Sequence, residues 1–479
     1  MTIPPLLSRH ALLASALLIT AACAHYEPKP LALEQNRRQL QSRRLTDVDV
    51  LARVRAVTAS GETGNDNAQP VTWGRAQLLV AALELNPSLA EARAHLAQTS
   101  AALATARTLE NPTVSLASEY DTSRADESPW LWGIGTSFLL DSFLSRPQRI
   151  DLAQASIRGA HADFSEAIWT VRRDLREALL GMVIARQRLG VLELDVQQRA
   201  ELARLARSRV KVGMSARAEE SQAELELSRS RVALDEARRL EVAGKSALAA
   251  ALGVSVEAIG EISPQWEDLD SIELPAESTL RSLRDQALLS RPDLERAIAE
   301  YQAREIELRQ QVRQQYWQAS LGPGYTWDHG IRKVTLGASF SLPIFNRNEG
   351  PIAEAVAARE AAGRHAMTVQ ATILSEVDAA AVSYATALSA LERARQQRTT
   401  NESLAASERR AFAADATDKP TLLAAELAVS TERLAELDAL ERAQQALGQL
   451  EDSLRTPLFG PETRVRTLGA DDSMPRKSP

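Results

Sequence analysis

Four short segments alternate apolar residues with small or polar residues at every second position. They span 113–121, 130–140, 317–328 and 332–342. In the last segment the apolar positions are Val334, Leu336, Ala338, Phe340 and Leu342. A period of two is typical of β-strands with two unlike faces, and these lengths are close to the ~9–11 residues that a tilted strand needs to cross a bilayer. The pattern therefore predicts four strands, each with one apolar face.

Long runs between and after these strands repeat apolar residues every seven positions. In 149–211, which contains no proline, the repeat consists of Ile168, Leu175, Met182, Leu189, Val196, Ala203 and Val210. The later run consists of Val377, Tyr384, Leu391, Ala405 and Phe412, and is interrupted by Arg398 between Leu391 and Ala405. A strict seven-residue repeat predicts long helices that supercoil against their neighbours. We expect each run to turn back at a helix tip, near Gly213 in the first and near Pro420 in the second.

The two halves of the chain repeat one order of elements. Asn86-Pro87-Ser88-Leu89 and Arg291-Pro292-Asp293-Leu294 each open a helix, and the strands end in Ser137-Phe138 and Ser339-Phe340. Ile150 and Ala153 match Ile352 and Ala355 at one offset of 202 residues. The predicted fold class is mainly α with a small β part, built as a duplicated helix–strand–strand–helix repeat. The expected segments are a signal peptide 1–22, an N-terminal extension and linker 23–70, a first repeat 71–260, a connector 261–277, a second repeat 278–456 and a flexible tail 457–479.

The start of the chain has the features of a secretory signal. Arg9 and His10 precede the apolar stretch 11–19, and Thr20-Ala21-Ala22-Cys23 follows. Such a stretch is too short to span a bilayer as a helix. Cys23, the only cysteine, resembles the lipidated cysteine of a bacterial lipobox, and Ala24 after it fits delivery to the outer membrane. Ordinary cleavage after Ala22 or Ala24 is the alternative.

Composition narrows the class of protein. Aromatic residues make up only 4% of the chain, which favours long helices. The net charge of −7, with a pI near 5.6, argues against a nucleic-acid-binding surface. The mature chain has no run of eighteen apolar residues, so we expect no transmembrane helix, whereas a transmembrane barrel stays open.

Aromatic residues concentrate in the predicted strands, as in the girdles with which a barrel meets the membrane surface. The candidate girdle residues are Trp130, Trp132, Trp317, Trp327 and Phe340. Four strands cannot close a barrel, and open edges in lipid leave backbone groups unpaired at several kcal/mol each. If the strands cross a membrane, copies of the chain must therefore share one barrel. A small soluble β-cap with one buried face is the alternative.

Residues for enzymatic chemistry are not grouped in the sequence. The six histidines occur singly, and no phosphate-binding loop, nucleophile elbow or metal-ligand motif is present. The sequence predicts no enzyme, no cofactor and no metal centre.

The motifs resemble those of the TolC-type outer-membrane efflux proteins over residues 71–455. The stretch Leu342-Pro343-Ile344-Phe345-Asn346-Arg347-Asn348 in particular is similar to the CzcC-like branch, the outer partners of heavy-metal pumps. The resemblance implies a homotrimer with a twelve-stranded outer-membrane β-barrel continuing into a long periplasmic α-helical barrel. It also implies a periplasmic adaptor and an inner-membrane RND-type pump as partners, with outer-membrane lipid around the barrel and no nucleic acid. A drug or organic-solvent duct of the same family and a periplasmic coiled-coil scaffold lipoprotein are the alternatives.

Members of that family often close the periplasmic tip with acidic rings, but this chain departs from their pattern. The expected acids fall on Thr421 and Ala424, and the expected glycine falls on Asp415. Four acids near the two turns are candidates for a substitute gate: Asp415, Asp418, Glu219 and Glu220. A ring of such acids in a trimer would attract cations. Solvated turn residues are the alternative.

Overall fold

The computed structural model describes residues 26–58, 72–122, 128–316 and 318–467. The chain divides into two compact units, Met1–Arg43 and Arg44–Pro479. The described part of the first unit contains helix α2 (Leu33–Ser42), which buries no side chain. Exposed ion pairs lie along this helix, such as that between Arg37 and Glu34 at 2.6 Å.

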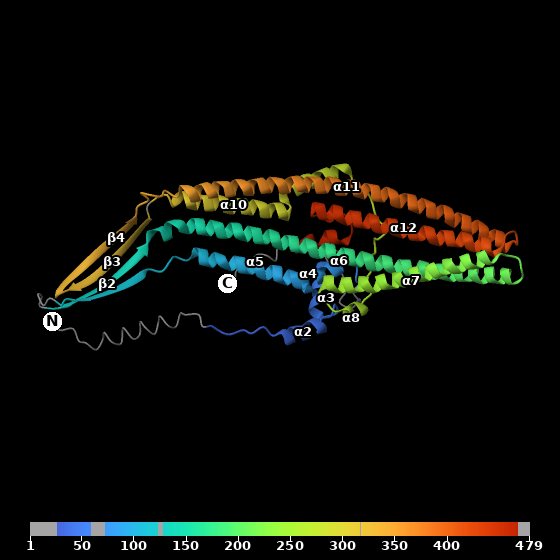
Figure 1. Cartoon of the computed structure of the whole chain (residues 1–479), viewed down its shortest axis with the longest axis horizontal. Helices are drawn as coiled ribbons and strands as arrows, with labels where there is room; N and C mark the ends of the chain where they lie inside the picture. The colour runs from blue at the N-terminus through green and yellow to red at the C-terminus, as the bar shows by residue number, and fades with distance from the viewer. Residues whose placement is uncertain (1–25, 59–71, 123–127, 317, 468–479) are drawn as a thin grey trace. The chain divides into compact units, whose positions relative to one another are not determined.

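The second unit is built mainly from long helices (Figure 1). Its elements are α3 (Val48–Thr58), α4 (Arg75–Leu85), α5 (Pro87–Arg107), β1 (Thr113–Tyr120), β2 (Trp130–Leu139), α6 (Leu140–Lys211), α7 (Arg217–Leu252), α8 (Val256–Gly260), α9 (Glu277–Ser290), α10 (Pro292–Arg313), β3 (Gln318–Asp328), β4 (Ile331–Ser341), α11 (Glu349–Ala413), α12 (Lys419–Leu454) and the 3₁₀ helix η1 (Pro461–Thr467). Helix makes up 73% and strand 9%. The predicted fold class is confirmed.

Helix ends confirm the duplication at the level of the backbone. Helices α6 and α7 end at positions that are 202 residues before the ends of α11 and α12. Gly213 and Asp415 occupy the same place after the first helix of each pair, and both have a left-handed backbone, with φ of 74° and 54°. Gly253 and Arg455 do the same after the second helix, with φ of 72° and 49°. Each hairpin therefore reverses and ends by the same local geometry.

Helix α6 begins earlier than the sequence indicated. The prediction placed the helical run in the proline-free segment 149–211, but the helix runs from Leu140 through Pro147. Side chains satisfy carbonyls of the first turn: Ser145 Oγ donates to Asp141 O at 2.8 Å, and Arg149 Nη2 donates to Ser142 O at 3.4 Å. Pro147 itself lacks the N–H that would bond to Phe143 O, so the helix continues past it with one backbone hydrogen bond fewer.

The four strands form one antiparallel sheet in the order β1-β2-β3-β4, so the two repeats join between β2 and β3. Strand positions agree with prediction to within one residue, while Trp317 lies outside the described residues. Cross-strand partners include Leu116 with Ile134, Trp132 with Trp327, and Tyr325 with Val334. Partners in a sheet point to the same side, so the apolar positions of all four strands share one face.

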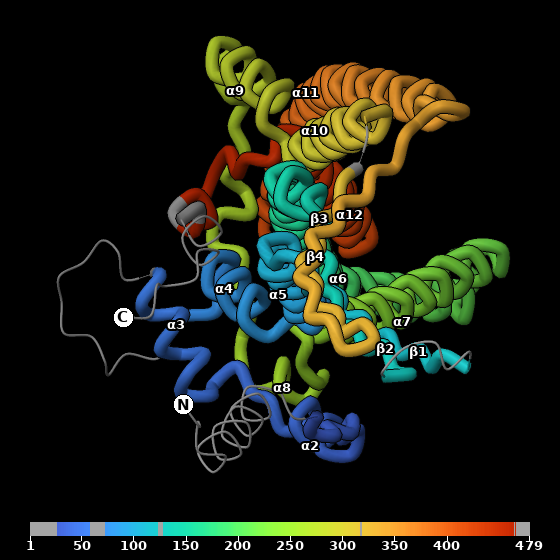
Figure 2. Tube along the Cα trace, turned by 90° about the vertical axis from the view of Figure 1, so that its left-hand side faces the viewer, coloured from blue at the N-terminus to red at the C-terminus, as the bar shows by residue number. Residues whose placement is uncertain are grey.

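Helix α6 occupies the centre of the helical packing, against α5, α7, α10 and α12 (Figure 2). The middle of each predicted seven-residue repeat lies in the core, where Leu175, Met182, Val377, Tyr384 and Leu391 are buried, whereas Phe412 near the helix tip is exposed. Residues between α8 and α9 form a belt across these helices: Tyr384 donates its hydroxyl to Glu273 O at 2.7 Å and Gln444 donates its amide to Leu269 O at 2.6 Å. Among the described residues, no helix combines the length and apolar character required to cross a bilayer.

Candidate functional site: an apolar sheet face, two helix tips and a buried ion cluster

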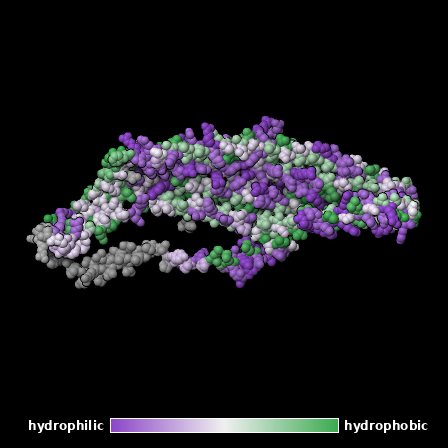
Figure 3. All heavy atoms as spheres, in the orientation of Figure 1, coloured by the Kyte–Doolittle hydropathy of each residue, from purple (hydrophilic) through white to green (hydrophobic). Residues whose placement is uncertain are grey.

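The apolar face of the sheet is open to solvent in the single chain. Leu116 is 80% exposed, Val334 85% and Leu336 71%. A contiguous exposed apolar surface of this kind marks a face that meets lipid or another protein. The visible surface of the long helices, in contrast, is largely hydrophilic (Figure 3).

Aromatic side chains cluster at one end of this face. The rings of Trp130 and Trp132 stack with centroids 5.4 Å apart, and Tyr120 meets Trp130 edge-on at 4.8 Å. Trp327 lies opposite Trp132 on the next strand. Phe340 faces the same side near the other end of β4 and is exposed. The structure thus brings the described candidate girdle residues onto one face, as the alternation predicts.

The opposite face carries glycine and hydroxyl side chains. Ser320 and Ser339 hydroxyls are 2.8 Å apart, and Lys333 pairs with Asp328. A Cβ built on Gly322 would lie 2.1 Å from Thr136 O, so no larger residue fits there without a shift of the backbone. This face is therefore close-packed, small and polar.

The sheet ends at β1 and β4, which have no strand beyond them in the described chain. An unpaired edge exposes backbone donors and acceptors that seek a partner strand. The sequence argument that the strands need further copies therefore applies to the observed sheet.

At the helix tips, part of the candidate acidic gate has a local structural role. Asp418 is the N-cap of α12, and its carboxylate accepts from Thr421 N at 3.0 Å and from Thr421 Oγ1 at 2.6 Å. These hydrogen bonds, together with the charge of Arg209, hold the pKa of Asp418 below its usual value. Pro420 lies in the first turn of α12, where a backbone N–H has no partner within the helix. Its missing N–H therefore costs the helix no hydrogen bond.

The remaining tip acids differ in their surroundings. Glu220 pairs with Arg207 at 3.2 Å, and the same guanidinium also binds Glu224. Glu219 and Asp415 are exposed. Lys419 lies 5.3 Å from the centre of the Phe412 ring. Basic and acidic groups are therefore interspersed at the tips.

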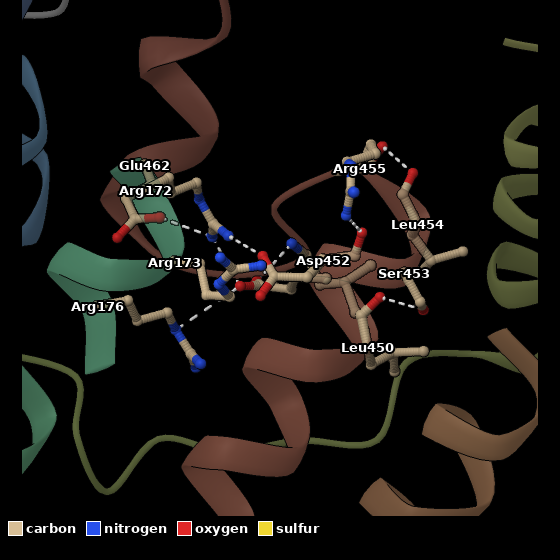
Figure 4. A network of polar contacts seen from close by, with 12 residues as sticks. Arg172, Arg173, Arg176, Leu450, Asp452, Ser453, Leu454, Arg455 and Glu462 are labelled. Atoms are coloured by element: carbon tan, nitrogen blue, oxygen red, sulfur yellow. Dashed lines mark hydrogen bonds and ion pairs between the residues drawn. The ribbon is translucent and has the colours of Figure 1, made fainter. Parts of the chain in front are cut away.

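A buried ion cluster joins the middle of α6 to the end of α12 and to η1, and the sequence analysis did not predict it (Figure 4). Arg172 of α6 binds Glu451 of α12 at 2.7 Å and Glu462 of η1 at 2.7 Å. Arg176, one turn further along α6, donates to Gln444 O at 2.7 Å. The sequence does hold a signal, because Arg172 and Arg176 stand four residues apart within the apolar repeat.

The cluster extends to α4 and the belt. Arg75 pairs with Asp268 at 2.6 Å, and the Trp266 ring lies 4.8 Å from the guanidinium of Arg75 and 5.4 Å from that of Arg176. Glu451 also accepts from Leu458 N at 2.7 Å. These contacts join α4, α6, α12, the belt and the C-terminal segment.

Burial and neighbouring charges act in opposite directions on the acids of this cluster. Burial opposes ionisation of Glu451, but Arg172 and Arg176 outweigh it and hold its pKa below the usual value. For Asp452 burial dominates and raises the pKa to about 6, although the same arginines favour the charged form.

The prediction of a flexible tail from 457 is wrong for its described part. Residues 461–467 form η1, and Glu462 and Val465 are buried. The physical reason is the long-range ion pair between Glu462 and Arg172, which sequence order does not reveal. Cys23 and residues 468–479 lie outside the described residues. Within the described chain, no three His, Cys, Asp or Glu side chains come together as a metal site would require.

Comparisons with known proteins agree with this architecture. Residues 78–254 match the model of the outer membrane efflux protein family. A search of curated proteins finds no match. Similar solved structures include the outer membrane protein VceC of Vibrio cholerae, at 18% identity, 79% coverage of this chain, 95% of VceC and a TM-score of 0.64. The CmeC outer membrane channel of Campylobacter jejuni is 14% identical, with 86% of this chain and 95% of CmeC covered and a TM-score of 0.65. The MtrE outer membrane channel of Neisseria gonorrhoeae in its open state is 17% identical, with 80% of this chain and 89% of MtrE covered and a TM-score of 0.64.

The fold is thus that of the outer-membrane efflux channels. The resemblance to TolC-type outer-membrane efflux proteins, drawn from the sequence motifs, is confirmed.

Proposed function

We propose that this chain is the outer-membrane duct of a tripartite exporter. Three copies would contribute four strands each to one twelve-stranded barrel, and their helices would form a tunnel through the periplasm. The observation that carries the proposal is the open sheet, whose four strands share one exposed apolar face and leave β1 and β4 as edges. Lipid around the barrel would cover the apolar face, and a closed ring of strands would pair the edges of β1 and β4.

The duct would be passive. A periplasmic adaptor would dock at the helix tips near Gly213 and Pro420, and an inner-membrane RND-type pump would supply the energy. The small polar face of the sheet would line a water-filled bore. Anchoring through a lipidated Cys23 and location in the outer membrane complete the proposal; metabolic labelling with palmitate, lost in Cys23→Ser, tests the anchor.

Heavy-metal cations are the proposed cargo, supported by the similarity of the stretch from Leu342 to Asn348 to the CzcC-like branch. The proposed gate consists of Asp415, Asp418, Glu219 and Glu220. A multidrug or organic-solvent duct is the second candidate. It is favoured by the tips themselves, where the charge of Arg207 offsets that of Glu220, so that less net negative charge is left to select cations.

Deletion of the gene followed by challenge with metal salts and with drugs distinguishes these cargoes. Sensitivity to metals alone supports the first, and sensitivity to drugs alone supports the second. If the protein is a scaffold lipoprotein without transport function, deletion of its gene should cause neither sensitivity. The double variant Asp415→Asn/Glu219→Gln, with Asp418 and Glu220 unchanged, should reduce cation preference in conductance if the exposed acids form the gate.

A further inference from the structure

A pocket lies where the sheet meets the long helices, between the start of α6, the end of α10 and the start of β3 (Figure 1). Its volume is about 550 Å³, which is in the size range of sites that hold small ligands. The lining combines apolar side chains with two guanidinium groups: Leu140, Leu144, Tyr316, Ala319, Arg149 and Arg313. The proposed duct gives this pocket no role.

The pocket lies on the apolar side of the sheet. Ala319 stands opposite Phe340 on the neighbouring strand, so both side chains point to the apolar face. Ala319 is buried in the pocket, while Leu144 and Tyr316 at its walls are each 64% exposed. The exposed apolar surface therefore continues from the strands into the pocket. If the strands cross the outer membrane, the pocket lies at the periplasmic surface of its inner leaflet, where lipid head groups meet water.

The charged groups of the lining suit a phosphate. Arg313 donates to Asp141 at 2.9 Å and to Gln148 at 3.2 Å. Arg149 is 3.5 Å from Glu110, which is 55% exposed and outside the lining, and its buried Nε has no hydrogen-bond partner among the described residues. The described lining thus holds two bases, one acid and a spare donor. Guanidinium groups bind phosphate oxygens with strong, charge-assisted hydrogen bonds.

The second repeat does not carry the same charges. Helix α11 matches α6 at the offset of 202, and this offset relates Asp141 to Pro343 and Arg149 to Pro351. Neither proline has a charge or a side-chain donor. The duplicated packing therefore does not require these charges, and they are a feature of the first repeat alone.

We propose that this pocket binds an anionic phospholipid of the inner leaflet of the outer membrane. The phosphate lies between Arg149 and Arg313, and an acyl chain follows Leu144 and Tyr316 towards the apolar face of the sheet. The inference rests on the proposed function, because lipid reaches the pocket only if the sheet is embedded in the membrane. Basic pockets at the level of the membrane surface are typical sites for lipid head groups.

Two other occupants fit the pocket less well. A free phosphate would leave the apolar walls formed by Leu140, Leu144 and Tyr316 uncovered. A segment of the adaptor would be far away, because the adaptor is proposed to dock at the tips and the pocket lies at the opposite end of α6. A lipid alone uses both the guanidinium groups and the apolar walls.

Native mass spectrometry of the full-length protein in detergent tests the proposal. Phosphatidylglycerol, with one net negative charge, and phosphatidylcholine, with none, are added separately at equal concentrations. We expect phosphatidylglycerol to be retained several-fold better, with up to one molecule per chain, and an excess of inorganic phosphate not to displace it. Arg149→Gln and Arg313→Gln should each lower its retention several-fold.

Two further variants separate the pocket from general attraction between charges. Arg146→Gln removes the same charge from the same part of α6, but Arg146 is exposed and does not line the pocket, so retention should be unchanged. Ser145→Phe fills the pocket and leaves both arginines in place, so retention should fall. This second variant tests the pocket even if Arg313→Gln disturbs the fold through loss of the pair with Asp141.

The failures of this inference and of the proposed function are distinguishable. A trimer that conducts ions but holds phosphatidylglycerol no better than phosphatidylcholine overturns the lipid site alone. The same conclusion follows if Arg146→Gln lowers retention as much as Arg149→Gln, if Ser145→Phe leaves retention unchanged, or if inorganic phosphate displaces the lipid. A monomer that never conducts and retains no lipid overturns both.

Discussion

Arg172 and Glu462 bind each other at 2.7 Å although one lies in the first repeat and the other near the C-terminus. Their side chains are 5% and 4% exposed. Two buried charges are stable only when each has partners, so this pair fixes the C-terminal segment against α6. The belt and α4 join the same cluster, so it holds these segments, α6 and the end of α12 together.

Loss of the Glu462 charge from this cluster should destabilise the protein. Glu462→Gln leaves Arg172 with less negative charge around it, and we expect a cost of about 3–5 kcal/mol, as for a broken buried pair. Urea unfolding followed by circular dichroism measures the change. The matched control is Glu236→Gln, which breaks an exposed pair with Arg239 and should leave the unfolding midpoint unchanged. Equal midpoints for both variants would contradict a stabilising cluster.

Gly460 should tolerate substitution less well than Gly213. Both have a left-handed backbone, with φ of 83° and 74°, so alanine costs roughly 1–2 kcal/mol at each from backbone strain. A Cβ at Gly460 would also lie 1.9 Å from Arg75 Nη2, whereas nothing lies within 4 Å of one at Gly213. Displacing Arg75 disturbs its pair with Asp268, so Gly460→Ala should lose a further ~1–3 kcal/mol. Thermal unfolding of the two variants makes the comparison; a larger loss for Gly213→Ala would be the contrary result.

The Asp452 carboxyl should give the protein a measurable pH dependence. Its folded pKa of about 6 lies above the usual 3.8, so the charged form is disfavoured in the fold. The resulting penalty is fully present above pH 6 and disappears as the pH falls towards the unfolded value. Asp452→Asn should therefore be more stable than wild type by up to about 3 kcal/mol at pH 7.5, from a shift of about two units. The difference should shrink steadily between pH 6 and pH 4 in parallel urea titrations, and a constant difference would refute this assignment.

Adjacent residues on β4 should respond oppositely to a lysine. Leu336 faces the apolar side and Thr335 the small polar side. Leu336→Lys on a lipid-facing strand should cost about 2–4 kcal/mol, while Thr335→Lys should be tolerated in a water-filled bore. Extraction of membranes with urea, followed by immunoblotting, measures how much of each variant is inserted. Equal insertion of both variants would argue against a lipid-facing sheet.

The sequence predicted what depends on periodicity. Alternation located the strands and their faces, and the seven-residue repeat located Leu175, Met182 and Tyr384 in the core, since burial on one face leaves a regular imprint. Contacts between segments that are distant in sequence leave no such periodic pattern. The pairing of β2 with β3 and the binding of Glu462 to Arg172 arise from tertiary packing, so the cluster and the docked residues 461–467 were missed. Asp418 was chosen for its charge, and its capping role emerged only from the contact with Thr421.

Conductance of the purified protein in planar lipid bilayers tests the central claim most directly. Discrete single-channel steps, carried by a detergent-resistant trimer and lost in Leu336→Lys, are the predicted result. A protein that leaves the membrane with salt alone, stays monomeric and never conducts would contradict a lipid-embedded duct.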